Sequence, residues 1–430
     1  MSGRSHAIVT DRDRCVGCVA CTRVCPTSAI RVRDSQAVFD DELCIDCGTC
    51  IEACKYDAVR PRTSSPADLR RFKHTVAVPS LTLYAQFGDD VHPGRVLHAL
   101  RQVGFDETYD ISWMCEMVAG ATDAYLSESK GPWPKISVTC PAVVRLVQIR
   151  YPDLIPHLVP IETPRELAAR LRRRRLAAEL GLDPSEIGMF FITPCTAIIN
   201  SIESPEGLDA SYLDGAFSIA ELYGPLLRAI KSNPGTDSTE MISARGLRWA
   251  MAGGEISSMR NANTITVRGL RDVLYVFDRI ESGTFQGIDF IEAYICSGGC
   301  VGGQLTVAGR YLAQRNIRQL ARHLSGQGAV KEEKVRSMLR EHFFDLESEF
   351  RARPVRPLAR DLRQAIALKR EKDEILQRLP RKDCGACGAP DCETLADDIV
   401  RGTARLGDCV FVRLESLHGE SGTDKGDHHA

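Results

Sequence analysis

The spacing of hydrophobic residues changes repeatedly along the central part of the chain. Short β-branched runs such as HTVAVPS at 74–80 and GMFFITPC at 188–195 predict buried strands. Amphipathic stretches such as PGRVLHALRQVGF at 93–105 and PAVVRLVQIRY at 141–151 predict helices. Because strands that alternate with helices form parallel sheets with covering helices, we expect an α/β domain over about residues 75–325.

Four further segments surround this domain, so the fold class is multidomain α/β. They are a cysteine-rich module (1–60), a helical linker (326–381), a small helical module with cysteines (382–415) and a disordered tail (416–430). Residues 55–74 are rich in proline, serine and charge and read as a connection between modules. The charged linker predicts two solvated helices that are broken near Pro354 and Pro357.

Charge and composition remove several classes of function. Lys and Arg number 55 against 57 Asp and Glu, a formal net charge of -2, which leaves no electrostatic footprint for nucleic acid. No apolar run reaches the ~20 residues that span a bilayer, and the N-terminus is polar, so we expect a cytoplasmic protein. Seventeen cysteines in that compartment stay reduced, which points to metal or redox chemistry rather than disulfides.

The first dense group of cysteines contains the run C-x2-C-x2-C-x3-C twice. The two runs are Cys15, Cys18, Cys21, Cys25 and Cys44, Cys47, Cys50, Cys54. This spacing resembles bacterial two-cluster ferredoxins, in which the fourth cysteine of each run binds the other 4Fe-4S cluster. The resemblance implies one cluster on Cys15, Cys18, Cys21 and Cys54, and a second on Cys44, Cys47, Cys50 and Cys25. A pair of zinc sites is the alternative.

The second dense group lies near the C-terminus. Its cysteines are Cys384, Cys387, Cys392 and Cys409. The pattern resembles a small iron–sulfur domain with the motif CGxCGxxxC, a helix and a lone cysteine, which implies a further 4Fe-4S cluster. Glycines allow the backbone to bend closely around such a cluster. The stretch ETLADDIVRGTARL at 393–406 predicts the helix, with Leu395 and Ile399 facing inward. A zinc knuckle stays open as an alternative.

The central cysteines are isolated in sequence, but their surroundings are informative. The segments are VTCP at 138–141, TPCTA at 193–197 and FIEAYICSGGCVGGQ at 290–304. In order, they resemble the three signature segments of the iron-only (FeFe) hydrogenases. The resemblance implies that Cys140, Cys195, Cys296 and Cys300 hold a fourth 4Fe-4S cluster, with Cys300 as the bridge to a two-iron subsite. Only Cys115 is then left over, and we expect it to be a packing residue.

Several positions depart from the hydrogenase pattern. Thr139 stands where the family has a proton-donating cysteine, and Ile198 stands where it has a lysine that binds a cyanide ligand. The positions of the family's proton path fall on Ala119, Thr122 and Val159, none of which titrates at neutral pH. The overall amino-acid sequence is most similar to the sensory and regulatory branch of the family. Hydrogen chemistry is therefore expected to be weakened or lost.

Three interpretations of function follow from the sequence. In the first, four 4Fe-4S clusters form an electron relay or redox sensor, and the two-iron subsite is absent or altered. In the second, the protein is a slow or sensory hydrogenase, an oxidoreductase of the ferredoxin hydrogenase type, with a complete active-site cluster. In the third, it is an iron–sulfur subunit of a larger oxidoreductase complex. Expected partners are electron-transfer proteins, a larger redox complex or a signalling protein.

Overall fold

The computed structural model describes residues 6–232, 242–260, 263–324, 330–353 and 357–420. Two compact units divide the chain, and each is described by itself. Unit 1 contains residues 1–7, 45–48 and 61–352, whereas unit 2 contains residues 8–44, 49–60 and 353–430. Pro354 and residues 421–430 of the expected tail lie outside the described residues. Within the described ranges, no helix has the length and apolar character needed to cross a membrane.

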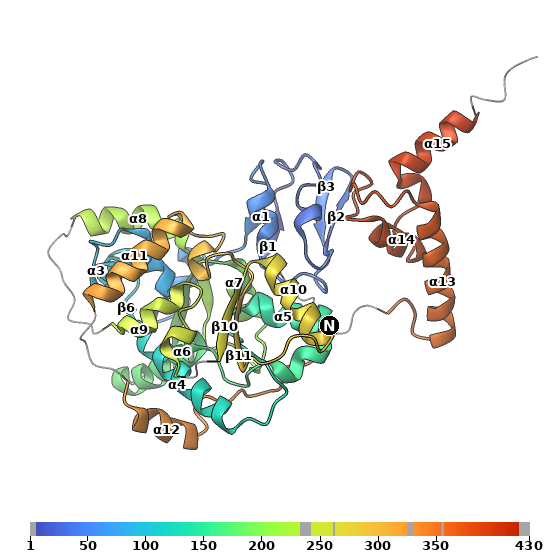
Figure 1. The fold of residues 1–430 in the computed structure, drawn as a ribbon. Helices are drawn as coiled ribbons and strands as arrows, with labels where there is room; N and C mark the ends of the chain where they lie inside the picture. Colours follow the sequence, from blue (N-terminus) through green and yellow to red (C-terminus); the bar gives the residue numbers. More distant parts are fainter. Residues whose placement is uncertain (1–5, 233–241, 261–262, 325–329, 354–356, 421–430) are drawn as a thin grey trace, which may run out of the picture. The chain divides into compact units, whose positions relative to one another are not determined.

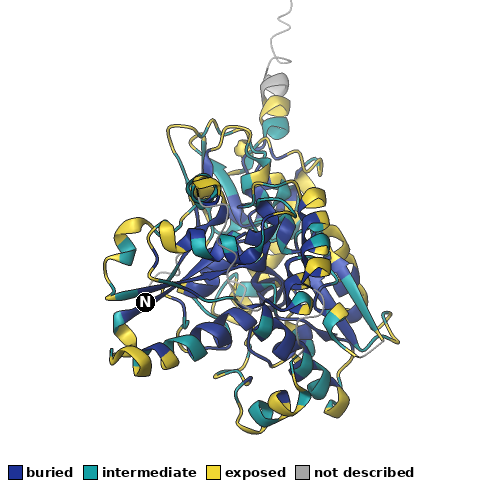
Figure 2. Ribbon diagram, turned by 90° about the vertical axis from the view of Figure 1, so that its left-hand side faces the viewer, coloured by how far each residue is buried: buried dark blue, intermediate teal, exposed yellow. Residues whose placement is uncertain are grey.

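Unit 1 is built around two parallel sheets (Figure 1). The larger sheet has the order β6-β5-β8-β9 and contains β5 (His74–Pro79), β6 (Glu107–Thr108), β8 (Ile187–Thr193) and β9 (Gly215–Ser218). The smaller sheet has the order β10-β11-β7 and contains β7 (Lys135–Ile136), β10 (Thr264–Arg268) and β11 (Phe290–Tyr294). Every residue of β8 and β11 is buried. Figure 2 colours the buried residues of the chain dark blue. The predicted α/β class is confirmed.

Helices cover these sheets, and most of them contribute side chains to one large apolar cluster. They are α2 (Pro66–Leu69), α3 (Pro93–Gln102), α4 (Ser112–Glu128), α5 (Pro141–Arg150), α6 (Pro164–Leu180), α7 (Thr196–Glu203), α8 (Ile219–Ser232), α9 (Ala244–Leu247), α10 (Leu270–Glu281), α11 (Arg310–His323) and α12 (Glu332–Arg340). The expectation of a solvated linker is wrong for α12, because Val335 and the following Phe344 are buried in this core. Their apolar side chains outweigh the charged residues around them.

Unit 2 combines short strands with helices. Its elements are β1 (Ile8–Thr10), β2 (Ile30–Arg33), β3 (Gln36–Phe39), β4 (Val59–Pro61), α1 (Thr49–Ala53), α13 (Leu362–Arg378), α14 (Cys392–Val400) and α15 (Val410–Glu420). Strands β2 and β3 pair antiparallel. Helix α14 ends at Val400 rather than near 406, because Gly402 takes a φ of 74°. The expected tail begins as helix, since α15 continues to Glu420.

Candidate iron–sulfur site

The first ferredoxin-like set of cysteines lines one small cavity in unit 2. Its members are Cys15, Cys18, Cys21 and Cys54. Burial, together with the charges of the other three sulfurs, raises the pKa of Cys21 to about 11. Gly17 lies between two of them with a φ of 66°, and a Cβ there would come within 2.8 Å of the Ser35 Cα. The loop can therefore close only around glycine.

The second ferredoxin-like set is divided differently. Cys25, Cys44 and Cys50 lie in unit 2, whereas Cys47 is counted with unit 1. The Cys25 sulfur accepts a hydrogen bond from the Ala29 N–H at 3.2 Å, as sulfurs of cluster ligands commonly do. The assignment of a cluster to this set stays a prediction.

Three of the central cysteines lie at the starts of helical segments that follow buried strands. Cys140 precedes α5, Cys195 precedes α7, and Cys300 begins the short 3-10 helix Cys300–Gly302. Backbone N–H groups at the start of α5 and α7 point at the Cys140 and Cys195 sulfurs and lower their pKa values. Burial still dominates and raises the Cys195 pKa to about 12.

These sulfurs also lie near one another. The charges of Cys140 and Cys195 raise the pKa of Cys300 beyond the effect of its burial. The fourth cysteine, Cys296, accepts a hydrogen bond from the Gln304 Nε2 at 3.5 Å. Buried thiols that repel one another as thiolates are a donor set suited to a cationic iron centre, whose charge relieves that repulsion. The residues present therefore fit a cluster, although the ligand assignments stay predictions.

Glycines let other backbone segments approach this cysteine loop closely. A Cβ on Gly299, whose φ is 77°, would lie 2.3 Å from the Ala252 nitrogen. A Cβ on Gly303 would lie 2.4 Å from the carbonyl oxygen of Pro194, which precedes Cys195. Side chains at these two positions would push the signature segments apart.

The positions of the family's proton path surround one small cavity. Thr122, Thr139 and Val159 all line it. Glu255 lines the same cavity and accepts a hydrogen bond from Ser137 Oγ at 2.6 Å and one from Thr139 Oγ1 at 3.4 Å. The proton-path positions themselves carry no titratable group, as their residue types predict. Glu255 supplies one to the same cavity, and it could not be found from the motif because it is remote in sequence from Cys140.

A second buried carboxylate accompanies Glu255. Glu292 on β11 accepts hydrogen bonds from the N–H groups of Gly253, at 3.0 Å, and Glu255, at 3.2 Å. Burial and the negative charge of Glu292 raise the pKa of Glu255 to about 8. The sequence signal was an acid inside the apolar strand FIEAY, since a charged residue there is rarely buried without a purpose.

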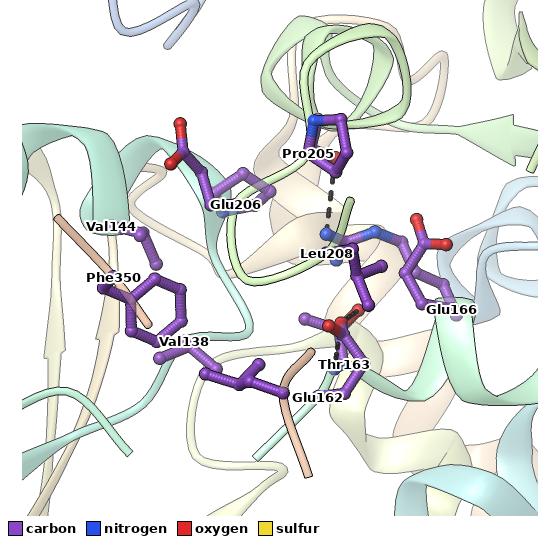
Figure 3. Close-up of a pocket in the computed structure, with 13 residues that line it drawn as sticks. Val138, Val144, Glu162, Thr163, Glu166, Pro205, Glu206, Leu208 and Phe350 are labelled. Carbon is purple, nitrogen blue, oxygen red and sulfur yellow. Dashed lines mark hydrogen bonds between the residues drawn. The ribbon is translucent and has the colours of Figure 1, made fainter. Parts of the chain in front are cut away.

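A further cavity adjoins the segment that carries Cys140 (Figure 3). It is lined by Val138, Glu162, Glu166 and the buried Arg165 among others. The Nη2 of Arg165 donates to Ser201 Oγ at 3.3 Å, and its Nε has no partner among the described residues. Burial and the negative charge of the neighbouring Glu166 together raise the pKa of Glu162 to about 7. The charge of Arg165 lowers the pKa values of the nearby central cysteines.

The C-terminal cysteines share a small apolar cluster in unit 2. Cys387, Cys392 and Cys409 pack there with residues of α13 and α14, including the inward-facing Leu395. Burial raises the pKa of Cys387, and the charges of Cys409 and Cys384 raise it further. All four sulfurs of this set are therefore grouped by the fold, as a cluster ligand set requires.

Comparison with known families identifies the central domain. A model described as the iron only hydrogenase large subunit, C-terminal domain, matches residues 73–229 and 226–304, which together exceed half of the chain. The chain belongs to the iron-only hydrogenase family. A 4Fe-4S dicluster domain model matches residues 7–55, and an Fe-S cluster model matches residues 379–411. The protein is thus an iron–sulfur, hydrogenase-like family member.

Curated relatives match parts of the chain. Iron hydrogenase 1 of Clostridium pasteurianum is 32% identical over 114 residues, 26% of this chain and 20% of its own. The periplasmic Fe hydrogenase large subunit of Nitratidesulfovibrio vulgaris is 29% identical over 211 residues, 45% of this chain and 50% of its own. The cytosolic Fe-S cluster assembly factor NAR1 of Neosartorya fischeri is 30% identical over 100 residues, 21% of this chain and 17% of its own. The chain thus spans at most half the length of these relatives.

Solved structures support the fold. An apo form of the FeFe-hydrogenase HydA1 from Chlamydomonas reinhardtii matches with a TM-score of 0.50 at 17% identity. The match covers 68% of this chain and 98% of that protein. The matched fold therefore includes nearly all of that protein, which is shorter than this chain.

Proposed function

We propose that this hydrogenase-family protein is a four-cluster electron relay or redox sensor in which hydrogen turnover is weakened. A bound 4Fe-4S cluster takes up and releases one electron at a time. The sixteen cysteines outside Cys115 supply four sets of four thiolates, and the fold groups the sulfurs within three of those sets. A chain with that many centres is suited to passing electrons.

The observation that carries the weakened turnover is the apolar character of two positions at which the family resemblance implies polar groups. Ile198 and Ala119 are buried, and neither side chain can donate a hydrogen bond or a proton. A positioned cation would stabilise an anionic ligand by about 1.5–3 kcal/mol, and Ile198 contributes nothing of this kind. Retention of a two-iron subsite is therefore disfavoured at this position.

Glu255 favours a second candidate, a slow or sensory hydrogenase with the two-iron subsite. Its carboxyl group is buried within hydrogen-bond reach of Thr139, and its pKa of about 8 keeps it protonated at neutral pH. A protonated acid beside Thr139 can donate a proton into this region, which Thr139 alone cannot do.

An infrared spectrum distinguishes the two candidates. Protein matured in a host that builds two-iron subsites is expected to show no CO or CN bands and almost no hydrogen evolution if it is a relay. Bands together with slow evolution support the second candidate. Hydrogen evolution at rates ordinary for catalytic family members would refute the weakened chemistry.

The localisation and partners of the relay follow from the same proposal. We place the protein in the cytoplasm, with a redox protein or a signalling protein as the recipient of its electrons. The exposed Cys384 gives the C-terminal set an edge that such a partner can reach. Cross-linking from a residue beside Cys384 in cell extract, followed by mass spectrometry, would identify the partner.

A further inference from the structure

The C-terminal cysteine loop is bound to strand β2 within unit 2. The N–H of Val32 donates to the carbonyl oxygen of Gly388 at 2.8 Å. The Nη1 of Arg33 donates to the carbonyl oxygen of Cys387 at 3.2 Å. The loop is thus held through its main chain, at a cysteine and the residue directly after it.

Two arginines of β2 hold the same module through one carboxylate. Arg31 donates from Nε and Nη2 to the two oxygens of Asp398, at 2.7 and 3.1 Å. Arg33 donates from Nη2 to Asp398 Oδ2 at 2.7 Å. The Asp398 side chain is only 10% exposed, so these charge-assisted hydrogen bonds are largely shielded from water. Asp398 therefore acts as a clamp between α14 and β2. Figure 1 shows these two elements side by side.

Gly388 makes the close approach possible. Its φ is 86°, and a Cβ at this position would lie 2.1 Å from the Val32 carbonyl oxygen. By contrast, Gly402 in the same module has a φ of 74° with nothing within 4 Å of a Cβ. Gly388 is therefore needed for two reasons: the backbone has a positive φ there, and a side chain would prevent the contact with β2.

Val32 also lines the cavity of the first ferredoxin-like set. That cavity is bounded by Val32 and by Cys15, Cys18, Cys21 and Cys54. One residue thus contributes to the wall of one cysteine set and donates its N–H to the loop of another. The C-terminal set belongs with the ferredoxin-like module in the same compact unit.

We propose that the Asp398 clamp fixes the C-terminal iron–sulfur centre against Val32 and makes it the direct electron-exchange neighbour of the first ferredoxin-like centre. One electron passes between the two 4Fe-4S centres, so that one is oxidised as the other is reduced. Asp398 is a positioning residue, because it holds the loop without touching either centre. This inference rests on the proposed relay and adds the order of two of its centres.

The test compares Asp398→Asn with Asp397→Asn in the full-length, anaerobically reconstituted protein. Asp397 is its neighbour on α14 and pairs with Lys372 and Arg401, so the control removes the same charge without touching β2. Hydrogen exchange at the Val32 amide reports docking. Electron paramagnetic resonance of the fully reduced protein reports magnetic interaction between the two centres, and iron analysis confirms that both are present.

The native protein and the Asp397→Asn variant should show a protected Val32 amide and interaction-broadened signals. Asp398→Asn should exchange this amide at least tenfold faster and show two separate signals at unchanged iron content, and Asp398→Glu should restore the broadening in part. Two centres without interaction in the native protein would overturn this inference alone. Interaction that persists after the amide has lost protection would also overturn it. Absence of the C-terminal centre from native protein would refute the four-cluster relay together with this inference.

Discussion

Replacement of Arg145 by methionine is expected to open the segment around Asp46. The Arg145 Nη1 lies 3.3 Å from Asp46 Oδ2, and both side chains are fully buried. Asn200 also donates to this carboxylate, and the Ala7 N–H donates to its other oxygen at 2.8 Å. Removing one partner of a buried ion pair typically costs about 3–5 kcal/mol, because the remaining charge loses its compensation.

The loss of stability in the Arg145→Met variant should depend on pH. Burial already raises the pKa of Asp46 above its usual value, against the opposing effects of Arg145 and Asn200. A carboxyl group with a raised folded-state pKa stabilises the fold most at low pH, and this contribution is lost as pH rises through the folded-state pKa. Without Arg145 the pKa of Asp46 rises further, so the variant should lose more stability at pH 8 than at pH 5.

The assay is hydrogen exchange at the Ala7 amide, which reports the free energy of local opening. Arg62→Met provides the control, because Arg62 pairs with Glu203 in a half-exposed position where such pairs contribute about 0–1 kcal/mol. The double variant Asp46→Asn with Arg145→Met should recover part of the loss. The reasoning fails if Arg145→Met opens Ala7 no more than Arg62→Met does, or if the loss is equal at both pH values.

Three further changes test the central site. Arg165→Gln should lower the midpoint potential of the central cluster by on the order of 50 mV, because a positive charge beside an anionic centre is lost. A spectroscopic redox titration measures this shift. Arg170→Gln, on the same helix, is the control and should leave the potential unchanged. Glu255→Gln should flatten the pH dependence of unfolding. The raised folded-state pKa of about 8 stabilises the fold fully below pH 4.5, and on the order of 5 kcal/mol is lost as pH rises through 8; an unchanged slope would contradict this. Cys115→Ser should retain the native iron content, about sixteen atoms for four cubanes, and a loss of four would make Cys115 a ligand.

Strong local patterns allowed much of the fold to be predicted. The runs at 74–80 and 188–195 became β5 and β8, because apolar β-branched residues between helical stretches suit a buried parallel strand. The linker was less predictable. Its charged residues suggested solvated helices, but Val335 and Phe344 are buried in the core of unit 1. A few apolar side chains decide such a segment, and their partners are remote in sequence.

The candidate site, like the fold, could be predicted from the sequence only in part. Cysteine spacing predicts the ligand sets of the two dense groups, and the segments around the isolated central cysteines predict the remaining set. Glu255 and Arg165 were missed, since neither belongs to a local motif and each reaches the site through tertiary packing. Asp398 was missed for a related reason. Its partners Arg31 and Arg33 precede it by more than 360 residues, and sequence spacing carries no information about such a pair.

The division of the chain at residues 45–48 bears on how this protein could have been inherited. A gene shortened to begin after residue 60 would encode every signature cysteine of the hydrogenase-like unit but would lack Asp46. Arg145 would then remain in the interior without the Asp46 carboxylate, and Glu206, 3.8 Å from its Nε, would be the acidic partner that is left. Loss of the ferredoxin-like module would thus also remove a buried counter-ion from the hydrogenase-like unit. Descendants that discard the ferredoxin-like module should therefore have replaced Arg145 first.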